Sequence, residues 1–122
     1  MDVIIVGPCG AGKSTLVDAL NTQGYKARVV AQEHSVVPDL WQRGGRPAAL
    51  IVLEAERSTI VRRRGGDFPV WLLEQQRERL ASARAHADLV LHTDEAAPEE
   101  VASQVVEYLQ SAGIEPAVLR DS

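Results

Sequence analysis

A glycine-rich stretch close to the start of the chain carries the strongest chemical signal. Residues 7–15 read GPCGAGKST and match the pattern G-x-x-x-x-G-K-[ST] at every fixed position: Gly7, Gly12, Lys13 and Ser14. A glycine-rich loop can aim successive backbone N–H groups at phosphate oxygens, and the start of a following helix adds its partial positive charge. The stretch therefore predicts a phosphate-binding loop.

Two side chains of this loop have specific roles to fill. We expect Lys13 to neutralise the β- and γ-phosphates of a nucleoside triphosphate and the Ser14 hydroxyl to coordinate Mg²⁺. Cys9 is the single cysteine of the chain, and no base stands beside it in the sequence, so we expect it to contribute its backbone alone. The expected nucleotide contacts are Gly7, Pro8, Cys9, Gly10, Ala11, Gly12, Lys13, Ser14 and Thr15.

Phosphoryl transfer also needs a carboxylate near the metal or the attacking hydroxyl. Two candidates stand at the carboxyl ends of predicted strands, where α/β sheets bind their ligands: Glu33 in VAQEHS and Glu54 in LIVLEA. We favour Glu33 as the catalytic group that positions metal or acceptor, with Glu54 as the alternative metal ligand; in a third interpretation neither touches the metal. His34 either orients a substrate or is a surface or capping residue.

A basic segment, RSTIVRRR at residues 57–64, precedes a Gly-Gly pair that serves as a hinge or a turn. Arginine spreads positive charge over phosphoryl oxygens as charge moves toward the leaving group, and one or two arginines would be enough. The alternative is a solvated helix face balanced by nearby acids. The candidate catalytic arginines are Arg62, Arg63 and Arg64.

The tryptophans and the remaining histidines give weaker functional signals. Trp41 and Trp71 are expected to be packed in the interior rather than stacked on a base. His86 and His92 lack metal-ligand spacing with cysteine or acids, so no zinc site is expected.

Alternating strands and helices must hold these residues. Apolar, β-branched runs predict buried parallel strands over residues 3–6, 28–31, 48–53 and 88–92. Helical patterns cover residues 13–23, 57–64, 70–87 and 98–112, and a further helix could begin at Pro38. This alternation predicts a three-layer α/β/α fold with a short parallel sheet of about four strands and right-handed crossovers.

Size and composition limit the possible classes. The chain has 122 residues, which predicts one domain over residues 1–113 and a C-terminal tail over 114–122. A net charge of −4 argues against a nucleic-acid partner, and no apolar run reaches membrane-spanning length. A lone cysteine and the absence of a signal-like N-terminus favour a cytoplasmic protein. Both a monomer and a homodimer stay open.

Other nucleotide-binding classes fit less well. A GTPase needs an N/T-K-x-D guanine reader after a late strand, and residues 92–95 read HTDE, without a lysine. Motor and assembly ATPases need a longer chain. A small-molecule phosphotransferase remains the leading class.

Four segments together resemble the small P-loop kinases of the shikimate, gluconate, adenylylsulfate and nucleoside or nucleotide kinase group. They are GPCGAGKST, LIVLEAE at 50–56, RSTIVRRR at 57–64 and ADLVLHTDEAAPEEVASQVVEYL at 87–109. The resemblance implies a P-loop NTPase fold with strand order 2-1-3-4, and ATP and Mg²⁺ as cofactors. It also implies transfer of the γ-phosphate to a small metabolite or nucleotide-like acceptor. The basic helix would form a lid over the phosphates, and adenine would lie between that helix and the HTDEAAP loop.

The chain is shorter than this group at one place. Residues 31–47 connect the second and third predicted strands, which is room for one crossover helix but not for the extra strand and acceptor domain of those kinases. Two other functions therefore stay open. One is a simple NTPase with water as the acceptor, and the other is a nucleotide-binding regulatory module with negligible turnover.

Overall fold

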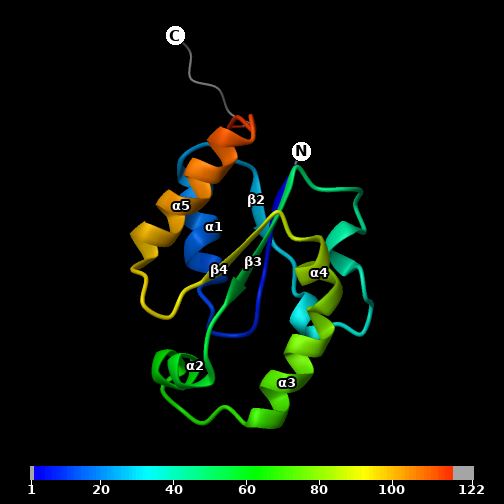
Figure 1. Ribbon diagram of the computed structural model, residues 1–122, viewed down its shortest axis with the longest axis vertical. Coiled ribbons are helices and arrows are strands. Elements are labelled where there is room, and N and C mark those ends of the chain that lie inside the picture. Colours follow the sequence, from blue (N-terminus) through cyan, green and yellow to red (C-terminus); the bar gives the residue numbers. More distant parts are fainter. Residues whose placement is uncertain (1, 117–122) are drawn as a thin grey trace.

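A computed structural model describes residues 2–116, in which four parallel strands form one sheet (Figure 1). The strands are β1 (Val3–Val6), β2 (Ala27–Val29), β3 (Ala49–Glu54) and β4 (Leu89–His92), in the order β2-β1-β3-β4. The α-helices of this part of the chain are α1 (Lys13–Thr22), α2 (Arg57–Arg64), α3 (Val70–Arg79), α4 (Ala81–His86) and α5 (Pro98–Ser111). The expected mixed α/β fold with a short parallel sheet is confirmed.

Two apolar layers cover the sheet because successive side chains of a strand point to opposite faces. Ile5 and Leu53 point toward α1 and α5, where they pack with Leu16 and Val105. The alternate residues of β1 and β3, with Trp41, Leu80 and Ala83, form the second layer. Figure 1 shows α1 and α5 on one side of the sheet and α4 on the other, so the architecture is α/β/α.

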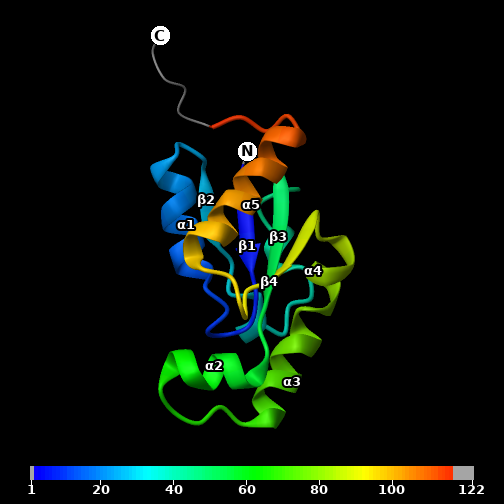
Figure 2. The same cartoon turned by 60° about the vertical axis from the view of Figure 1, so that its left-hand side comes forward.

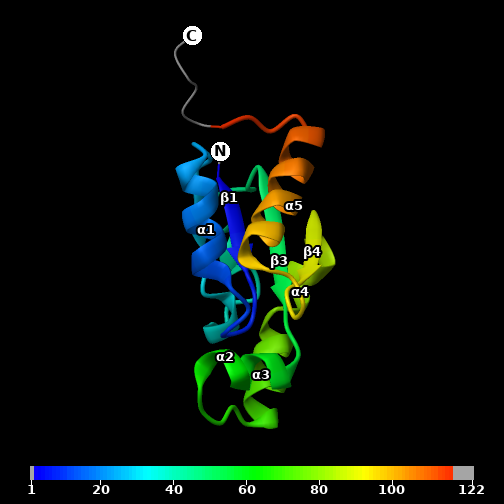
Figure 3. The ribbon, with the colours of Figure 1, turned by 90° about the vertical axis from the view of Figure 1, so that its left-hand side faces the viewer.

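The carboxyl ends of all four strands meet at one edge of the sheet, as parallel pairing requires. The glycine-rich loop follows β1 there, and the segments that follow β2, β3 and β4 begin at the same edge. Figures 2 and 3 show α2 lying beyond this edge, below the end of β3. This edge is where α/β sheets bind ligands.

The prediction of one continuous helix over residues 70–87 is wrong, because the chain forms the two helices α3 and α4 there. They meet at Leu80, whose φ of −91° and ψ of −2° tighten the turn, and its N–H is shared between Gln76 O and Arg77 O. Leu80 is buried against the second apolar layer. The break lets α4 pack on β3 while α3 packs on the segment after β2.

The helix expected near Pro38 is also absent from the described residues, since the connection from β2 to β3 contains the 3₁₀ turns η1 (Gln32–His34) and η2 (Leu40–Gln42). In this connection the buried side-chain amide of Gln32 forms hydrogen bonds with the backbone. Its Nε2 donates to Val37 O at 2.6 Å, and its Oε1 accepts from Trp41 N–H at 3.1 Å. These two bonds fix the turns against each other.

The two tryptophans differ. Trp41 is buried as expected, with 2% of its surface exposed, but Trp71 is 64% exposed on α3, so its expected burial is wrong. The buried face of α3 is formed by Leu73 and Gln76 instead. Within residues 2–116 no helix is long and apolar enough to cross a membrane. Of the expected C-terminal tail, residues 117–122 lie outside the described residues.

Candidate functional site at the glycine-rich loop

The backbone of the loop requires glycine where the sequence has it. A Cβ on Gly7 would stand 2.6 Å from Leu53 O, so β3 can approach the loop only because that side chain is missing. Gly12 has a φ of 100°, which other residues rarely adopt, and it directly precedes α1. The loop is therefore a strand-to-helix turn held close to β3.

Several N–H groups of the loop are available to a ligand. Ala11 N–H donates to Pro8 O at 3.2 Å, and Cys9 N–H donates to Gln76 Oε1 at 3.0 Å. The first backbone bond into α1 runs from Leu16 N–H to Gly12 O. N–H groups without an acceptor among residues 2–116 are those of Gly10, Gly12, Lys13, Ser14 and Thr15. These are the donors that a phosphate group would satisfy.

Lys13 is folded back over the loop and meets Glu33. Its Nζ donates to Gly7 O at 2.7 Å, to Pro8 O at 3.2 Å and to Glu33 Oε2 at 2.7 Å. The two charged side chains are 11% and 4% exposed. Glu33 Oε1 is buried and has no hydrogen-bond partner in the described part of the chain. A buried carboxylate oxygen with spare acceptor capacity thus lies beside the lysine.

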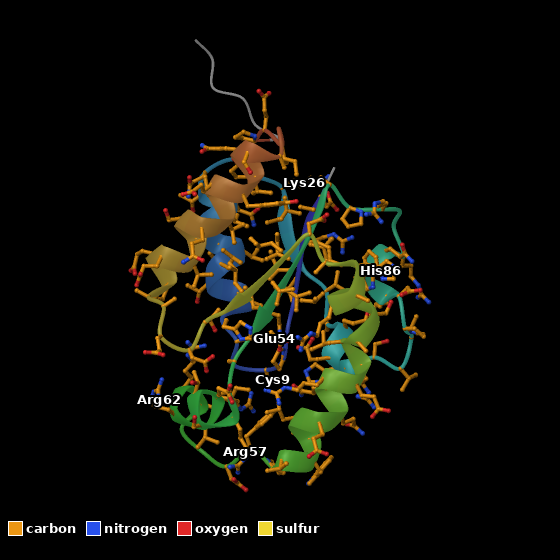
Figure 4. All side chains as sticks on the ribbon, viewed as in Figure 1. Cys9, Lys26, Glu54, Arg57, Arg62 and His86 are labelled. Carbon is orange, nitrogen blue, oxygen red and sulfur yellow. The ribbon has the colours of Figure 1, made fainter. Side chains whose placement is uncertain are left out.

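The structure does not bring Glu54 to this lysine. Glu54 shares its face of β3 with Leu50 and Val52, toward α4, and its carboxylate pairs with Arg84. The other face of the sheet carries α1. The side chain of Glu54 is buried near the end of β3 (Figure 4). The partner of Glu54, Arg84, lies on α4.

Of the three candidate arginines, only Arg63 contacts the loop. Its Nη1 donates to Gly10 O at 2.9 Å and to Thr93 Oγ1 at 3.0 Å, and its Nη2 donates to Thr93 O. Arg64 lies over the Phe68 ring at 5.4 Å from its centroid. Arg62 is exposed on the side of α2 that faces away from α3 (Figure 4).

The turn after β4 holds α2 in place, a role that sequence reasoning missed. Thr93 is buried, and its hydroxyl donates to Ala11 O at 2.9 Å. Asp94 Oδ1 accepts from Glu56 N–H at 2.7 Å and from the Thr59 hydroxyl at 2.6 Å, at the start of α2. The Thr93–Asp94 turn therefore binds both ends of α2.

These contacts change the pKa of the Asp94 carboxyl. Burial raises its pKa, but the hydrogen bonds from the Thr59 hydroxyl and the backbone N–H groups of Glu56 and Asp94, with the charge of Arg63, outweigh burial. The net result is a pKa below the usual value for aspartate. The turn thus holds an ionised carboxylate at the N-terminus of α2.

A cavity of about 220 Å³ opens beside the loop, between α2 and the segment that leads into α5. This is the region where the sequence predicts the adenine. A larger hollow of about 830 Å³ lies at the opposite end of the sheet, near the last turns of α1 and α5. The smaller cavity is lined by Ala11, Gly12, Thr15, Leu16, Arg63, Thr93, Ala96, Pro98 and Val101.

Cys9 has polar neighbours that its place in the sequence hides. His34 Nε2 is 3.5 Å from Cys9 Sγ, and Gln76 Nε2 donates to the same sulfur at 3.3 Å. A ring nitrogen therefore stands beside the thiol, contrary to the premise that Cys9 has no base near it. Gln76 was missed, although its spacing of three and four residues from Leu73 and Leu80 places it on the buried stripe of its helix.

A scan against protein-family models finds no matching family, and a search of curated proteins finds no significant match. The function of the chain is therefore inferred from the chemistry and geometry of this site.

Proposed function

We propose that the protein binds ATP with Mg²⁺ at the glycine-rich loop and transfers the γ-phosphate to a small metabolite or nucleotide-like acceptor. One observation carries this proposal. The G-x-x-x-x-G-K-S stretch forms the turn from β1 into α1 at the carboxyl edge of a parallel sheet, with a row of N–H groups that have no acceptor in the described residues. Phosphate groups are the ligands that such a row satisfies best.

The loop residues fit a triphosphate and its metal. Lys13 would exchange its bonds to Gly7 O and Pro8 O for bonds to phosphate oxygens. The exposed Ser14 hydroxyl, in the first turn of α1, would be a ligand of Mg²⁺, which prefers oxygen ligands. Bound Mg²⁺ supplies charge neutralisation at the β- and γ-phosphates.

In this proposal Glu33 would exchange its ion pair with Lys13 for an interaction near Mg²⁺. When Lys13 turns to the phosphates, the nearly buried Glu33 carboxylate loses its cation, and leaving that charge unpaired is unfavourable. A water held by Mg²⁺ or an acceptor hydroxyl would then meet the carboxylate. With an acceptor hydroxyl in place, Glu33 would accept its proton. We therefore expect nucleotide binding to depend strongly on Mg²⁺.

Arg63 and the neighbouring cavity fit the remainder of the nucleotide. The guanidinium lies on the loop at Gly10 O, where it would add positive charge toward the phosphates. The cavity beside it has Pro98 and Val101 on its α5 side, which gives a purine apolar surface. The lack of a guanine reader in HTDE favours adenine.

One observation favours a second candidate, hydrolysis of ATP with water as the acceptor. The connection from β2 to β3 contains only the turns η1 and η2 in place of a helix. This is the segment in which the small kinases carry their acceptor domain. An NTPase would use the same loop, lysine and carboxylate, and would need no acceptor pocket.

Transfer of labelled γ-phosphate from ATP tests the proposal. The protein with ATP and Mg²⁺ is expected to label a member of a panel of small hydroxyl, carboxyl and nucleotide acceptors, and Lys13→Ala is expected to abolish this transfer. Lys26→Ala is the matched control, because Lys26 is the other lysine of the chain and is 69% exposed. Phosphate release without an acceptor would support the NTPase. Binding of ATP without either product would support a regulatory module, and no binding would contradict all three.

A further inference from the structure

We propose that Cys9, Glu33 and His34 form a binding site for a zinc-like divalent transition-metal ion in the nucleotide-free protein. One sulfur, one carboxylate oxygen and one imidazole nitrogen of these residues lie within 4.8 Å of one another. This site goes beyond the nucleotide proposal and does not depend on it.

The spacing of the ligand atoms fits a tetrahedral ion. Zn–S bonds of about 2.3 Å and Zn–N or Zn–O bonds of about 2.1 Å at tetrahedral angles place sulfur and nitrogen about 3.6 Å apart and nitrogen and oxygen about 3.4 Å apart. The corresponding distances are 3.5 Å from Cys9 Sγ to His34 Nε2 and 3.6 Å from His34 Nε2 to Glu33 Oε2. These two separations need almost no rearrangement to hold the ion.

The chemistry of the donors selects the metal. Sulfur and imidazole favour zinc and its neighbours over Mg²⁺, which takes oxygen ligands. Glu33 is 3% exposed, and its Oε1 has no hydrogen-bond partner among residues 2–116, so it carries acceptor capacity that a cation can use. Binding as thiolate releases the Cys9 proton to solvent. Three protein ligands leave a fourth position for water.

Neighbouring contacts orient two of the ligands. The buried Gln76 amide accepts Cys9 N–H at 3.0 Å and donates to Cys9 Sγ at 3.3 Å, which fixes the sulfur relative to α3. His34 belongs to η1, which the Gln32 amide ties to the following segment. Such outer contacts are typical of metal sites in proteins.

Lys13 competes with the metal for Glu33. Its ammonium lies 2.7 Å from Glu33 Oε2, so a dication must displace it or bind despite its charge. Removing this lysine should therefore tighten metal binding, although the same change should abolish ATP binding. The two effects have opposite directions and separate the two proposals.

Titration of the nucleotide-free full chain with Co²⁺, in a thiol-free reductant, tests the site. We expect one equivalent to bind, with a thiolate-to-cobalt charge-transfer band and the ligand-field spectrum of a tetrahedral ion, and Zn²⁺ to displace it. Cys9→Ser should lose the charge-transfer band, and His34→Gln should bind Co²⁺ at least about tenfold more weakly. His86→Gln is the matched control and should bind as the parent protein does, because His86 contacts Ser82 O on α4.

Circular dichroism on each variant shows that it is folded. Absence of the band in the folded parent protein, or unchanged Co²⁺ affinity in both Cys9→Ser and His34→Gln, would overturn the proposal. Lys13→Ala should bind Co²⁺ about tenfold or more tightly than the parent, since a neighbouring positive charge is removed. Equal affinity of the two would show that the ion does not compete with Lys13 for Glu33 and would overturn the site as proposed.

Discussion

The Lys13 ammonium and the Glu33 carboxylate form a nearly buried ion pair, 2.7 Å apart, in the mouth of the glycine-rich loop. Lys13 is the first residue of α1, and Glu33 lies in η1 after β2, 20 positions further along the chain. Lys13 Nζ also donates to Gly7 O and Pro8 O, and its bond to Glu33 Oε2 pairs the two charges. A ligand that draws the Lys13 ammonium away must therefore also stabilise the charge of the Glu33 carboxylate.

The first prediction concerns the stability of this pair. Lys13→Ala should lower the free energy of unfolding by about 3 kcal/mol, because it leaves a buried carboxylate without its cation. The double variant Lys13→Ala/Glu33→Gln should recover part of this loss, since the remaining amide is neutral. Denaturant unfolding of the two single variants and the double variant measures the coupling. Additive losses would show that the pair contributes nothing.

The second prediction separates the two glutamates. Under the proposed function, Glu33→Gln should lower Mg²⁺-dependent turnover by about a hundredfold or more, because the buried carboxylate beside Lys13 is lost. Glu54→Gln should chiefly lower stability, since it leaves Arg84 without its partner. Turnover as a function of Mg²⁺ concentration, together with thermal unfolding, distinguishes them. A larger loss of turnover at Glu54 would reverse these assignments.

The third prediction concerns the basic helix. Arg63→Ala should weaken nucleotide binding and lower turnover by about a hundredfold, because Arg63 is the arginine of α2 that contacts Gly10 O and Thr93. Arg62→Ala is the matched control on the exposed side of the same helix and should change either quantity less than about twofold. Binding titrations and steady-state rates measure both. Equal losses in the two variants would contradict the role given to Arg63.

The fourth prediction uses pH. The pKa of Asp94 is below its usual value in the folded protein, so its ionised form stabilises the fold at neutral pH, and this contribution is lost as pH falls through the folded pKa. Asp94→Asn should therefore be less stable than the parent protein at neutral pH, and the difference should shrink in acid. Thermal unfolding of both proteins from neutral to acidic pH provides the measurement. A difference that stays constant with pH would show that the Asp94 charge is not involved.

Several elements follow directly from local sequence. The strand of residues 48–53 is a continuous apolar run, and it forms the fully buried β3. The pattern of residues 7–15 requires a strand before it and a helix after it, and β1 and α1 occupy those places. The lysine and the glutamate meet because parallel strands end at the same edge.

Other features depend on packing between distant segments. The break between α3 and α4 places the Leu80 side chain in the core. The helical pattern of apolar residues in the sequence continues through Leu80 unchanged, so it does not reveal the break. Which arginine of α2 contacts the loop depends on how Asp94 and Thr93 hold the helix, and these residues lie about 30 or more positions away in the chain. The neighbours of Cys9 are 25 and 67 positions away, so local pattern does not reveal them.

The attachment of α2 at both ends has a mechanical consequence. Asp94 accepts hydrogen bonds at its first turn and Thr93 accepts them from Arg63 in its last turn, so α2 is tied at both ends to the turn after β4. The helix carries Arg63 on its loop side, and the turn after β4 borders the small cavity through Thr93 and the segment leading to Pro98. A group that enters the cavity and displaces this turn would therefore also displace the loop, through the hydrogen bonds from Arg63 to Gly10 O and from Thr93 to Ala11 O.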